Sequence, residues 1–425
     1  MNTAIYSGVL VLALLGMPLF LVLLTLAGVG FTFADIDLIV IGIELYRLTD
    51  STVLMALPLF AFAGYLLGEA NTAQRVVRLS QALLGWLPGG MMLIALLTCA
   101  FFTMLTGGSG VTIVALGGLL YPALKDSHYS DRFSLGLVTT SGSLGILLPP
   151  AIPLILFGII AQQMDIPGID IIDLFIAGLM PALLMIVVLY AYGLWANRLQ
   201  PIQLTAFAWQ ECRDALKETV WELLIPVIIL GGVFSGVLIL SEAAAITALY
   251  VLVIETLIYR EIHLRTLVKA MRESMIMVGG ILLILGAAMA FTNLLVDVGI
   301  PSMLFDLIGT RIESPWVFLL LLNMLLLILG AFLDIFAAIV IMAPLVLPLA
   351  MQYGIDPVHL AIIFVANMQI GYFTPPVGMN LFIASYRFGK PITELYRAIW
   401  PFLLVLLAVV LLVTYIPWLS LALIR

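Results

Sequence analysis

Two Pro-Pro dipeptides interrupt apolar stretches of the chain, and each has a glycine four residues before its first proline. They read Gly145-Ile-Leu-Leu-Pro-Pro and Gly371-Tyr-Phe-Thr-Pro-Pro. Proline lacks a backbone donor and clashes with the preceding turn, so the carbonyls three and four residues earlier lose their helical partners. Glycine lets the backbone leave the helix without strain. Because unpaired carbonyls are costly in apolar surroundings, each break is either a packing feature or a source of oxygen ligands for a dehydrated cation such as Na⁺.

Further oxygen-bearing side chains stand at these breaks and at two other polar interruptions. Thr374 lies directly before the second proline pair, and the stretch TGGSG offers Thr106 and Ser109 among three glycines. The stretch GAFLD offers Gly330 and Asp334. A carboxylate within a membrane segment is a functional candidate, but a carboxylate at the start of a helix also caps it. Both interpretations of Asp334 stay open.

Candidate substrate groups cluster just before the first break. They are Thr139, Thr140, Ser141 and Ser143. Asn380 follows the second break, where it could contact an ion, a substrate or neighbouring side chains, and these alternatives also stay open. Asp334 and Asn380 are included with the four hydroxyl residues as candidates for substrate binding.

The composition is that of a polytopic membrane protein. Of 425 residues, 64% are hydrophobic and 10% are charged, whereas ordinary globular domains carry about 25% charged residues. A net charge of −7 argues against nucleic-acid binding. The sequence contains neither a phosphate-binding loop nor an H-E-x-x-H or G-x-S-x-G motif, so an enzyme is not expected.

Several apolar runs are long enough to cross a bilayer, which takes about 20 residues. They are residues 6–33, 52–69, 133–160, 172–197, 221–240, 243–259, 274–297, 359–386 and 396–423. Two further blocks, 90–124 and 316–350, are too long for one crossing, and each has a polar break near its middle. Such blocks favour re-entrant hairpins, in which non-helical backbone at membrane depth is buried in protein.

The charges of the loops place the two hairpins on opposite faces. Basic residues concentrate in short cytoplasmic loops, and Arg75 and Arg78 precede the first block while Lys125 and Arg132 follow it. The second block is flanked mainly by acidic residues, such as Asp356. An offset of 226 residues also carries one Gly-x-x-x-Pro-Pro break onto the other. These features predict an inverted repeat, an architecture of many secondary transporters with midplane sites on discontinuous helices.

Three stretches resemble the large membrane subunit of the tripartite ATP-independent periplasmic (TRAP) transporters, the DctM-like family. They are GSLGILLPPAIP (142–153), GAFLDIFAAIVIMAPLVLPLA (330–350) and GYFTPPVGMNLFIAS (371–385). The resemblance covers essentially the whole chain. It implies an elevator-type, Na⁺-coupled importer of a small organic anion, a carboxylate or sulfonate, in the bacterial inner membrane. It also implies a small four-helix membrane subunit (DctQ-like) and a periplasmic substrate-binding protein (DctP-like) as partners.

The resemblance further implies two Na⁺ sites. The first would use Thr106, Ser109, Gly145, Leu148 and Pro149, the last three through the backbone. The second would use Gly330, Gly371, Thr374 and Val377. The first tip departs from the usual Ser-Gly-Ser-Ser pattern, because Thr106 replaces the first serine and Gly108 the third residue.

The expected fold is therefore an all-α polytopic membrane protein, an inverted-topology repeat with two re-entrant helical hairpins and two broken helices, working in a lipid bilayer. Its expected divisions are N-terminal scaffold helices with an amphipathic arm (1–87), the first transport half (88–160), scaffold helices with amphipathic arms (161–315), the second transport half (316–386) and a C-terminal helix (387–425). The amphipathic segments are 205–223 and 260–274. Two other functions remain open: a stand-alone Na⁺/carboxylate symporter of the same design and a passive anion channel.

Overall fold

The computed structural model describes residues 8–9, 11–12, 16–47, 52–199, 207–300, 303, 312 and 314–424. All regular secondary structure in these ranges is helical. Seven helices are long and apolar enough to cross a membrane, or eight if the bent pair within 53–84 is one span. The prediction of an all-α polytopic membrane protein is thus confirmed, whereas part of the predicted span 6–33 lies outside the described residues.

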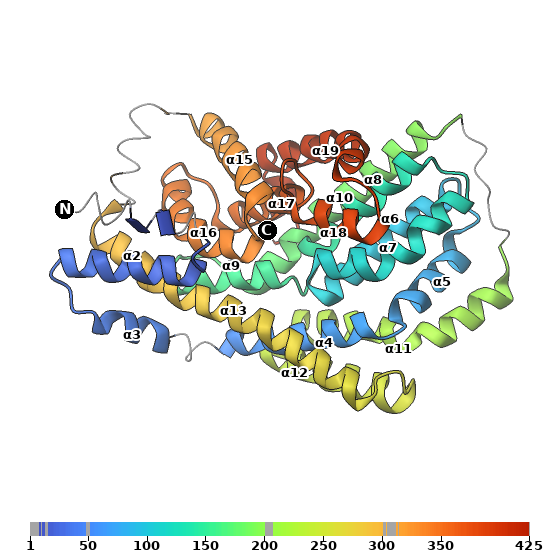
Figure 1. Ribbon diagram of the computed structural model, residues 1–425, viewed down its shortest axis with the longest axis horizontal. Coiled ribbons are helices and arrows are strands. Elements are labelled where there is room, and N and C mark those ends of the chain that lie inside the picture. Colours follow the sequence, from blue (N-terminus) through green and yellow to red (C-terminus); the bar gives the residue numbers. More distant parts are fainter. Residues whose placement is uncertain are drawn as a thin grey trace.

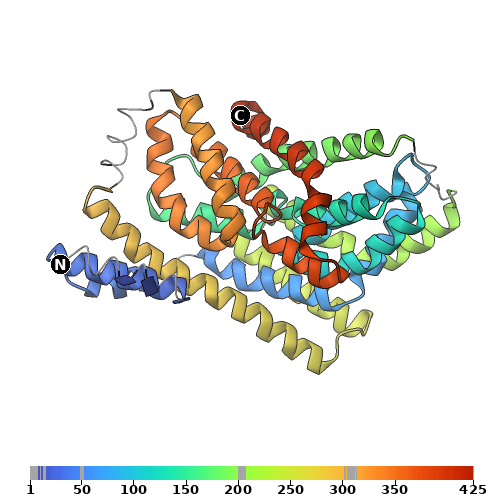
Figure 2. The same ribbon diagram turned by 45° about the horizontal axis from the view of Figure 1, so that its top comes forward.

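One group of helices lies along the lower and right-hand sides of Figure 1, and we call it the α13 layer. Its members are α2 (Leu19–Phe33), α3 (Ile39–Arg47), α4 (Ala56–Glu69), α5 (Thr72–Leu84), α11 (Trp209–Phe234), α12 (Leu240–Val253) and α13 (Leu264–Asp297). The 34-residue α13 packs against α2, α3 and α4. Figures 1 and 2 both show α13 running along this side of the molecule.

The remaining helices form what we call the hairpin body. The two hairpins are α6 (Gly90–Thr106) with α7 (Ser109–Asp126), and α15 (Pro315–Phe332) with α16 (Ile335–Gln352). The broken helices are α8 (Asp131–Ser141), η3 (Leu144–Leu147) and α9 (Ile152–Gln163), and then α17 (Pro357–Gly371) and α18 (Met379–Phe388). The last members are α10 (Ile171–Ala196), α19 (Ile392–Tyr415) and α20 (Trp418–Leu421).

Each predicted interruption has a local cause in the sequence. Gly107 ends α6 in the left-handed region, with φ of 68°, and Gly108 is extended before α7 begins. Asp334 separates α15 from α16 and accepts a hydrogen bond from the amide of Phe336. Both Pro-Pro peptide bonds, 149–150 and 375–376, are cis. The helix pairs and breaks lie where the sequence predicts them, whereas the re-entrant path of the hairpins and their relation as an inverted repeat stay predictions.

The division into scaffold and transport parts stays a prediction. Within the range 161–315, which is expected to be scaffold, α10 packs against α19, α20 and η3 of the hairpin body. The predicted amphipathic segments 205–223 and 260–274 are helical from Trp209 and from Leu264 onward, whereas residues 207–208 and 260–263 are not helical. Each helical part continues without a break into the apolar part of the same helix, α11 or α13.

A buried ion cluster joins α5 to α11 and to the turn that follows α12. The guanidinium of Arg75 pairs with Glu222, with Oε1 of Glu255 at 3.4 Å and with Oε1 of Glu261 at 2.5 Å. The side chains of Glu222 and Glu255 are fully buried, and that of Arg75 is 10% exposed. The hydroxyl of Tyr259 donates to Oε2 of Glu222 at 2.9 Å. An arginine assigned to a loop from its charge is thus the centre of an interhelical junction.

Replacing Arg75 is expected to destabilise the protein strongly. Arg75→Ala leaves Glu222 and Glu255 buried without their cation, and breaking a buried pair in this way costs about 3–5 kcal/mol. The measurement is thermal unfolding of the purified protein in detergent. Arg78→Ala is the matched control on the same helix, because Arg78 pairs with exposed Glu211 and Glu218, and a much smaller loss is expected there. Equal losses in the two variants would contradict this account.

Candidate ion and substrate site

The tip of the first hairpin packs directly on the first helix break. The hydroxyl of Thr103 donates to the carbonyl of Gly142 at 2.7 Å and lies 2.7 Å from the hydroxyl of Thr112. A methyl group on Gly145 would overlap the carbonyl oxygen of Ala100 and lie 2.6 Å from the amide nitrogen of Met104. Glycine is therefore required at position 145, and its backbone reaches the last turn of α6.

The candidate ligands of the first ion site end up on these two packed segments. Thr106 is the last residue of α6 and Ser109 is the first residue of α7, and both are buried. Gly145 lies in η3, and its carbonyl accepts a hydrogen bond from the amide of Leu148 at 3.0 Å. Leu148 and Pro149 continue the same break.

The second hairpin meets the second break through two glycines. A methyl group on Gly371 would lie 2.5 Å from the Cα of Gly330 and 3.0 Å from its carbonyl oxygen. The amide of Gly378 donates to the carbonyl of Ala331 at 2.9 Å, which ties the segment around Val377 to the end of α15. The structure therefore brings together the backbone of all the glycines and loop residues expected at this site.

Thr374 lies in the same break. Its hydroxyl donates to the carbonyl of Ile370 at 2.9 Å, and its amide donates to the carbonyl of Gly371 at 2.9 Å. A hydroxyl that donates to a carbonyl keeps its oxygen lone pairs. Thr374 can therefore present an oxygen acceptor at the break.

A side-chain hydrogen bond connects the two halves of the chain at the first tip. The hydroxyl of Ser109 donates to Oδ1 of Asn380 at 2.8 Å. The amide of Asn380 donates to the carbonyl of Tyr372 at 2.9 Å. Its side-chain Nδ2 is buried and has no partner among the described residues. Asn380 therefore links the first hairpin to the second break and keeps one donor free.

Asp334 occupies the capping position at the start of α16. Its carboxylate accepts hydrogen bonds from the amide of Phe336 at 3.0 Å and from the hydroxyl of Tyr372 at 2.9 Å. The same hydroxyl accepts from the amide of Ile335 at 3.2 Å. The capping interpretation thus has a direct structural basis, and Asp334 also lines the cavity described next.

A cavity of about 410 Å³ lies where both tips, both breaks and α13 meet. The first tip contributes Gly107 to Val111, and the second contributes Asp334 to Phe336. The breaks contribute Ile146, Tyr372 and their neighbours Pro153 and Met379. The hairpins reach this cavity from opposite ends of Figure 1, with α6 and α7 to the right and α15 and α16 to the left. This convergence makes the cavity the best candidate for a substrate site.

The four hydroxyl residues predicted to bind substrate lie outside the lining of this cavity. Thr139, Thr140, Ser141 and Ser143 are fully buried, and each hydroxyl donates to a backbone carbonyl three or four residues earlier. None is among the residues that line the cavity. Their assignment to substrate stays a prediction.

The α13 side of the cavity was not identified from the sequence. It consists of Ile276, Met277, Gly280, Ile281 and Ile284. An apolar span gives no sign of which face meets a substrate, so these positions had no sequence signal. Tyr372 was also missed, although a phenol inside an apolar helix break needs a hydrogen-bond partner and could have been paired with a nearby carboxylate.

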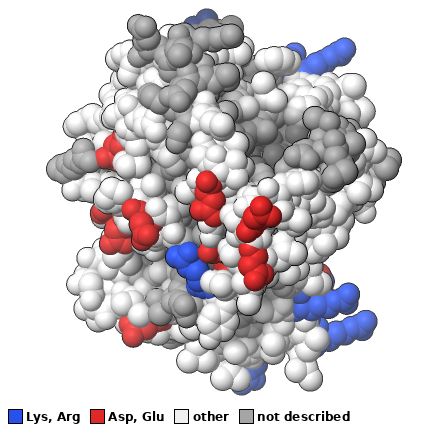
Figure 3. All heavy atoms as spheres, turned by 90° about the vertical axis from the view of Figure 1, so that its left-hand side faces the viewer, with Lys and Arg blue, Asp and Glu red and all other residues white. Residues whose placement is uncertain are grey.

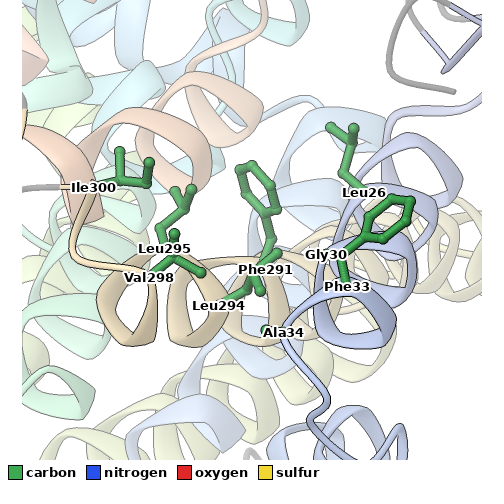
Figure 4. A pocket seen from close by; sticks show the side chains of 9 residues that line it. All are labelled: Leu26, Gly30, Phe33, Ala34, Phe291, Leu294, Leu295, Val298 and Ile300. Carbon is green, nitrogen blue, oxygen red and sulfur yellow. The ribbon is translucent and has the colours of Figure 1, made fainter. Parts of the chain in front are cut away.

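A second hollow, of about 650 Å³, lies between α2 and the end of α13. Figure 4 shows that only apolar side chains surround it, among them Leu26, Phe33, Phe291 and Leu295. The described residues that line it offer no side-chain ligand for an ion or an anionic group. The cavity between the hairpin tips, which has Ser109, Asp334 and Tyr372 in its lining, is therefore the candidate for transport.

Acidic side chains gather on the end of the molecule seen in Figure 3. The loop between α2 and α3, with exposed Asp35 and Asp37, lies at this end, as does Asp297 at the end of α13.

The capping role of Asp334 gives a test by substitution. Asp334→Ala removes the cap and is expected to cost about 0.5–2 kcal/mol of stability, measured by thermal unfolding in detergent. Asp334→Asn keeps an oxygen acceptor at the cap and is expected to stay near the parent value. Loss of stability in the asparagine variant as large as in the alanine variant would show that the charge, rather than the cap, stabilises this tip.

The chain matches the family model described as the DctM component of tripartite ATP-independent periplasmic transporters over residues 7–419. It is 35% identical to the C4-dicarboxylate TRAP transporter large permease protein DctM of Rhodobacter capsulatus, over 100% of this chain and 99% of that one. It is 35% identical to the isethionate TRAP transporter permease protein DctMQ of Oleidesulfovibrio alaskensis, over 87% of this chain and 57% of that one.

A solved structure supports the fold independently. The YdaH transporter of Alcanivorax borkumensis matches with a TM-score of 0.56 and 17% identity, over 88% of each chain. At this identity the likeness concerns the fold alone. Taken with the tips and breaks that converge on one cavity, the comparisons show that the chain belongs to the DctM family of TRAP transporter large permease subunits, multi-span proteins of the bacterial inner membrane.

Proposed function

We propose that this permease imports a small organic anion, a carboxylate or sulfonate, together with Na⁺, and receives the anion from a periplasmic binding protein. The observation that carries the proposal is the convergence of both hairpin tips and both helix breaks on one cavity. The relatives' names point to the same substrate chemistry, since one denotes a C4-dicarboxylate permease and the other an isethionate permease.

The candidate ion ligands suit Na⁺ by their chemistry. They are hydroxyl and backbone oxygens, and among the described residues no group of three His, Cys, Asp or Glu side chains could hold a metal ion. The first set is Thr106, Ser109, Gly145, Leu148 and Pro149, and the second is Gly330, Gly371, Thr374 and Val377. Bound Na⁺ would supply positive charge beside the cavity and so offset the charge of an anionic substrate.

The first tip also offers a favourable position for an anion. The start of α7 has no side-chain cap, because Gly108 precedes it. Backbone N–H groups and the helix dipole favour negative charge at such an end. The start of α16, by contrast, is occupied by Asp334. Ser109 and the free Nδ2 of Asn380 lie beside the uncapped end, and this supports binding of the anionic group at the first tip.

Transport in this proposal follows an elevator mechanism. The hairpin body carries both tips, both breaks and the cavity, while α13 contributes the opposite wall. Sliding of the hairpin body along the α13 layer would move the cavity between the two membrane faces. The apolar wall of α13 suits such sliding, since it makes no directional bonds to a substrate.

Reconstitution tests this function against the two alternatives. Proteoliposomes would hold the chain alone, with a small membrane subunit, or with that subunit and a binding protein, and uptake of labelled C4-dicarboxylates and isethionate would be measured with and without a Na⁺ gradient. We expect uptake only with both partners and the gradient. Na⁺-dependent uptake by the chain alone would indicate a stand-alone symporter, and gradient-independent uptake without a binding protein would indicate a channel.

Thr374→Val is expected to weaken Na⁺ dependence. The variant keeps the shape of the side chain but removes its oxygen, so the Na⁺ concentration for half-maximal uptake should rise at least about tenfold, the change that corresponds to about 1.4 kcal/mol. Thr247→Val is the matched control, because Thr247 in α12 makes the same hydroxyl bond to the carbonyl four residues earlier and lies outside the candidate site. An unchanged Na⁺ titration in Thr374→Val removes this residue from the ligand set.

A further inference from the structure

The tip of the first hairpin rests on two glycines of α4. Gly64 and Gly68 are four residues apart and so share one face of the helix. A methyl group on Gly64 would lie 2.6 Å from the Cα of Thr106 and 2.8 Å from the carbonyl oxygen of Leu105. On Gly68 it would lie 3.2 Å from a Cγ of Val111. The backbone of the tip therefore contacts the backbone of α4.

The contact at Gly64 differs from the other close contacts of this tip. A methyl group on Gly107 would meet the Cδ1 of Ile152 at 2.6 Å, and one on Gly110 would meet the Cδ1 of Ile383 at 2.6 Å. Those atoms are the ends of flexible side chains and can rotate away. The atoms opposite Gly64 are main chain and cannot. Gly64 also belongs to the α13 layer, whereas Ile152 and Ile383 belong to the hairpin body.

The position of the tip decides where the candidate ligands lie. The carbonyl of Thr106 is 2.9 Å from the methyl position on Gly64, and Ser109 follows three residues later. Gly107 to Val111 form one wall of the cavity. A shift of the tip away from α4 would therefore move that wall and the hydroxyls of Thr106 and Ser109 together.

We propose that Gly64 is a positioning residue that forms the seat on which the first hairpin tip closes beside the cavity. One added methyl group at residue 64 then disfavours the seated state relative to states in which the hairpin body has moved. The role of this contact in transport rests on the proposed function, but the contact itself requires neither Na⁺ nor substrate. Helix propensity acts in the opposite direction, since alanine favours helix over glycine.

The seat can be measured by disulfide formation between Gly68→Cys and Val111→Cys. A Cγ of Val111 lies 3.2 Å from the methyl position on Gly68, while the Cβ of Val111 lies beyond 4 Å, so the Cβ–Cβ separation falls at the upper end of the range of about 3.5–4.5 Å found in disulfides. The native Cys99 and Cys212 are both buried, and single-cysteine variants control for them. The full-length protein is placed in proteoliposomes in potassium buffer, and the rate of cross-linking is followed on oxidation.

Gly64→Ala is expected to slow this cross-linking at least about fivefold, the small end of the range for an overpacked contact. Gly231→Ala in α11 is the control, because a methyl group there meets nothing within 4 Å, and its rate should match the parent. An equal rate in Gly64→Ala, with an unchanged elution profile in size-exclusion chromatography, would overturn the proposal.

A second measurement covers the case in which Gly64→Ala does not fold. Gly68→Leu presses on the tip through Val111, whose branched Cβ restricts its rotation within α7. Amide hydrogen exchange of residues 105–112 should then become faster than in the parent. Unchanged exchange in that variant would also overturn the proposal. The control is again Gly231→Ala, in which exchange of this segment should stay at the parent rate.

Adding Na⁺ to the cross-linking assay separates this inference from the proposed function. If Gly64→Ala slows cross-linking but Na⁺ changes the rate in no variant, the seat stands and the assignment of Thr106 and Ser109 to Na⁺ fails. If Na⁺ changes the rate but Gly64→Ala does not, the ion site stands and the seat fails.

Discussion

Backbone polar groups at membrane depth must find partners inside the protein, and this constraint organises the structure around the cavity. Lipid offers no hydrogen bonds, so irregular backbone survives there only where protein or an aqueous cavity surrounds it. Two hairpin tips and two helix breaks expose such backbone. Each tip is therefore packed on the break of its own half, through Thr103 and Gly142 in one case and Gly330 and Gly371 in the other. The sites that could bind ions are the places where this packing brings several carbonyls together.

Close backbone packing explains why glycine recurs at these positions. At Gly145 and Gly371 a single methyl group would overlap or crowd main-chain atoms of the neighbouring hairpin. Glycine has an entropic cost in a helix. In return, the missing side chain allows two backbones to approach each other closely. The charged cluster around Arg75 also provides partners for buried polar groups, because its guanidinium pairs with the buried Glu222 of α11 and with the buried Glu255 that follows α12.

The sequence predicted the elements of this site better than their contacts. Proline pairs, glycines and isolated hydroxyls act locally, so the breaks at Pro149 and Pro375 and the tips near Gly107 and Asp334 could be located from residue types alone. Tertiary contacts, by contrast, could not be predicted from local residue types. Arg75 was expected in a loop because of its charge, but it lies in α5 and pairs with buried glutamates. Likewise, no periodicity within α13 marked Gly280 as a cavity residue. The hydroxyls of Thr139, Thr140, Ser141 and Ser143 cluster in the sequence, but each donates to a backbone carbonyl three or four residues earlier.

The two halves share motifs, yet the structure uses their tips differently. The second tip is fixed from within the hairpin body, because Asp334 and Tyr372 bond to each other and to the start of α16. The first tip has no capping side chain and is held by Asn380 from the other half and by the backbone of α4. In the proposed elevator movement, a contact that crosses from the hairpin body to the α13 layer would break, whereas a contact inside the body would not. The contact of the first tip with α4 is of the crossing kind. The bond between Asp334 and Tyr372 at the second tip lies inside the body, although α16 also packs against α13.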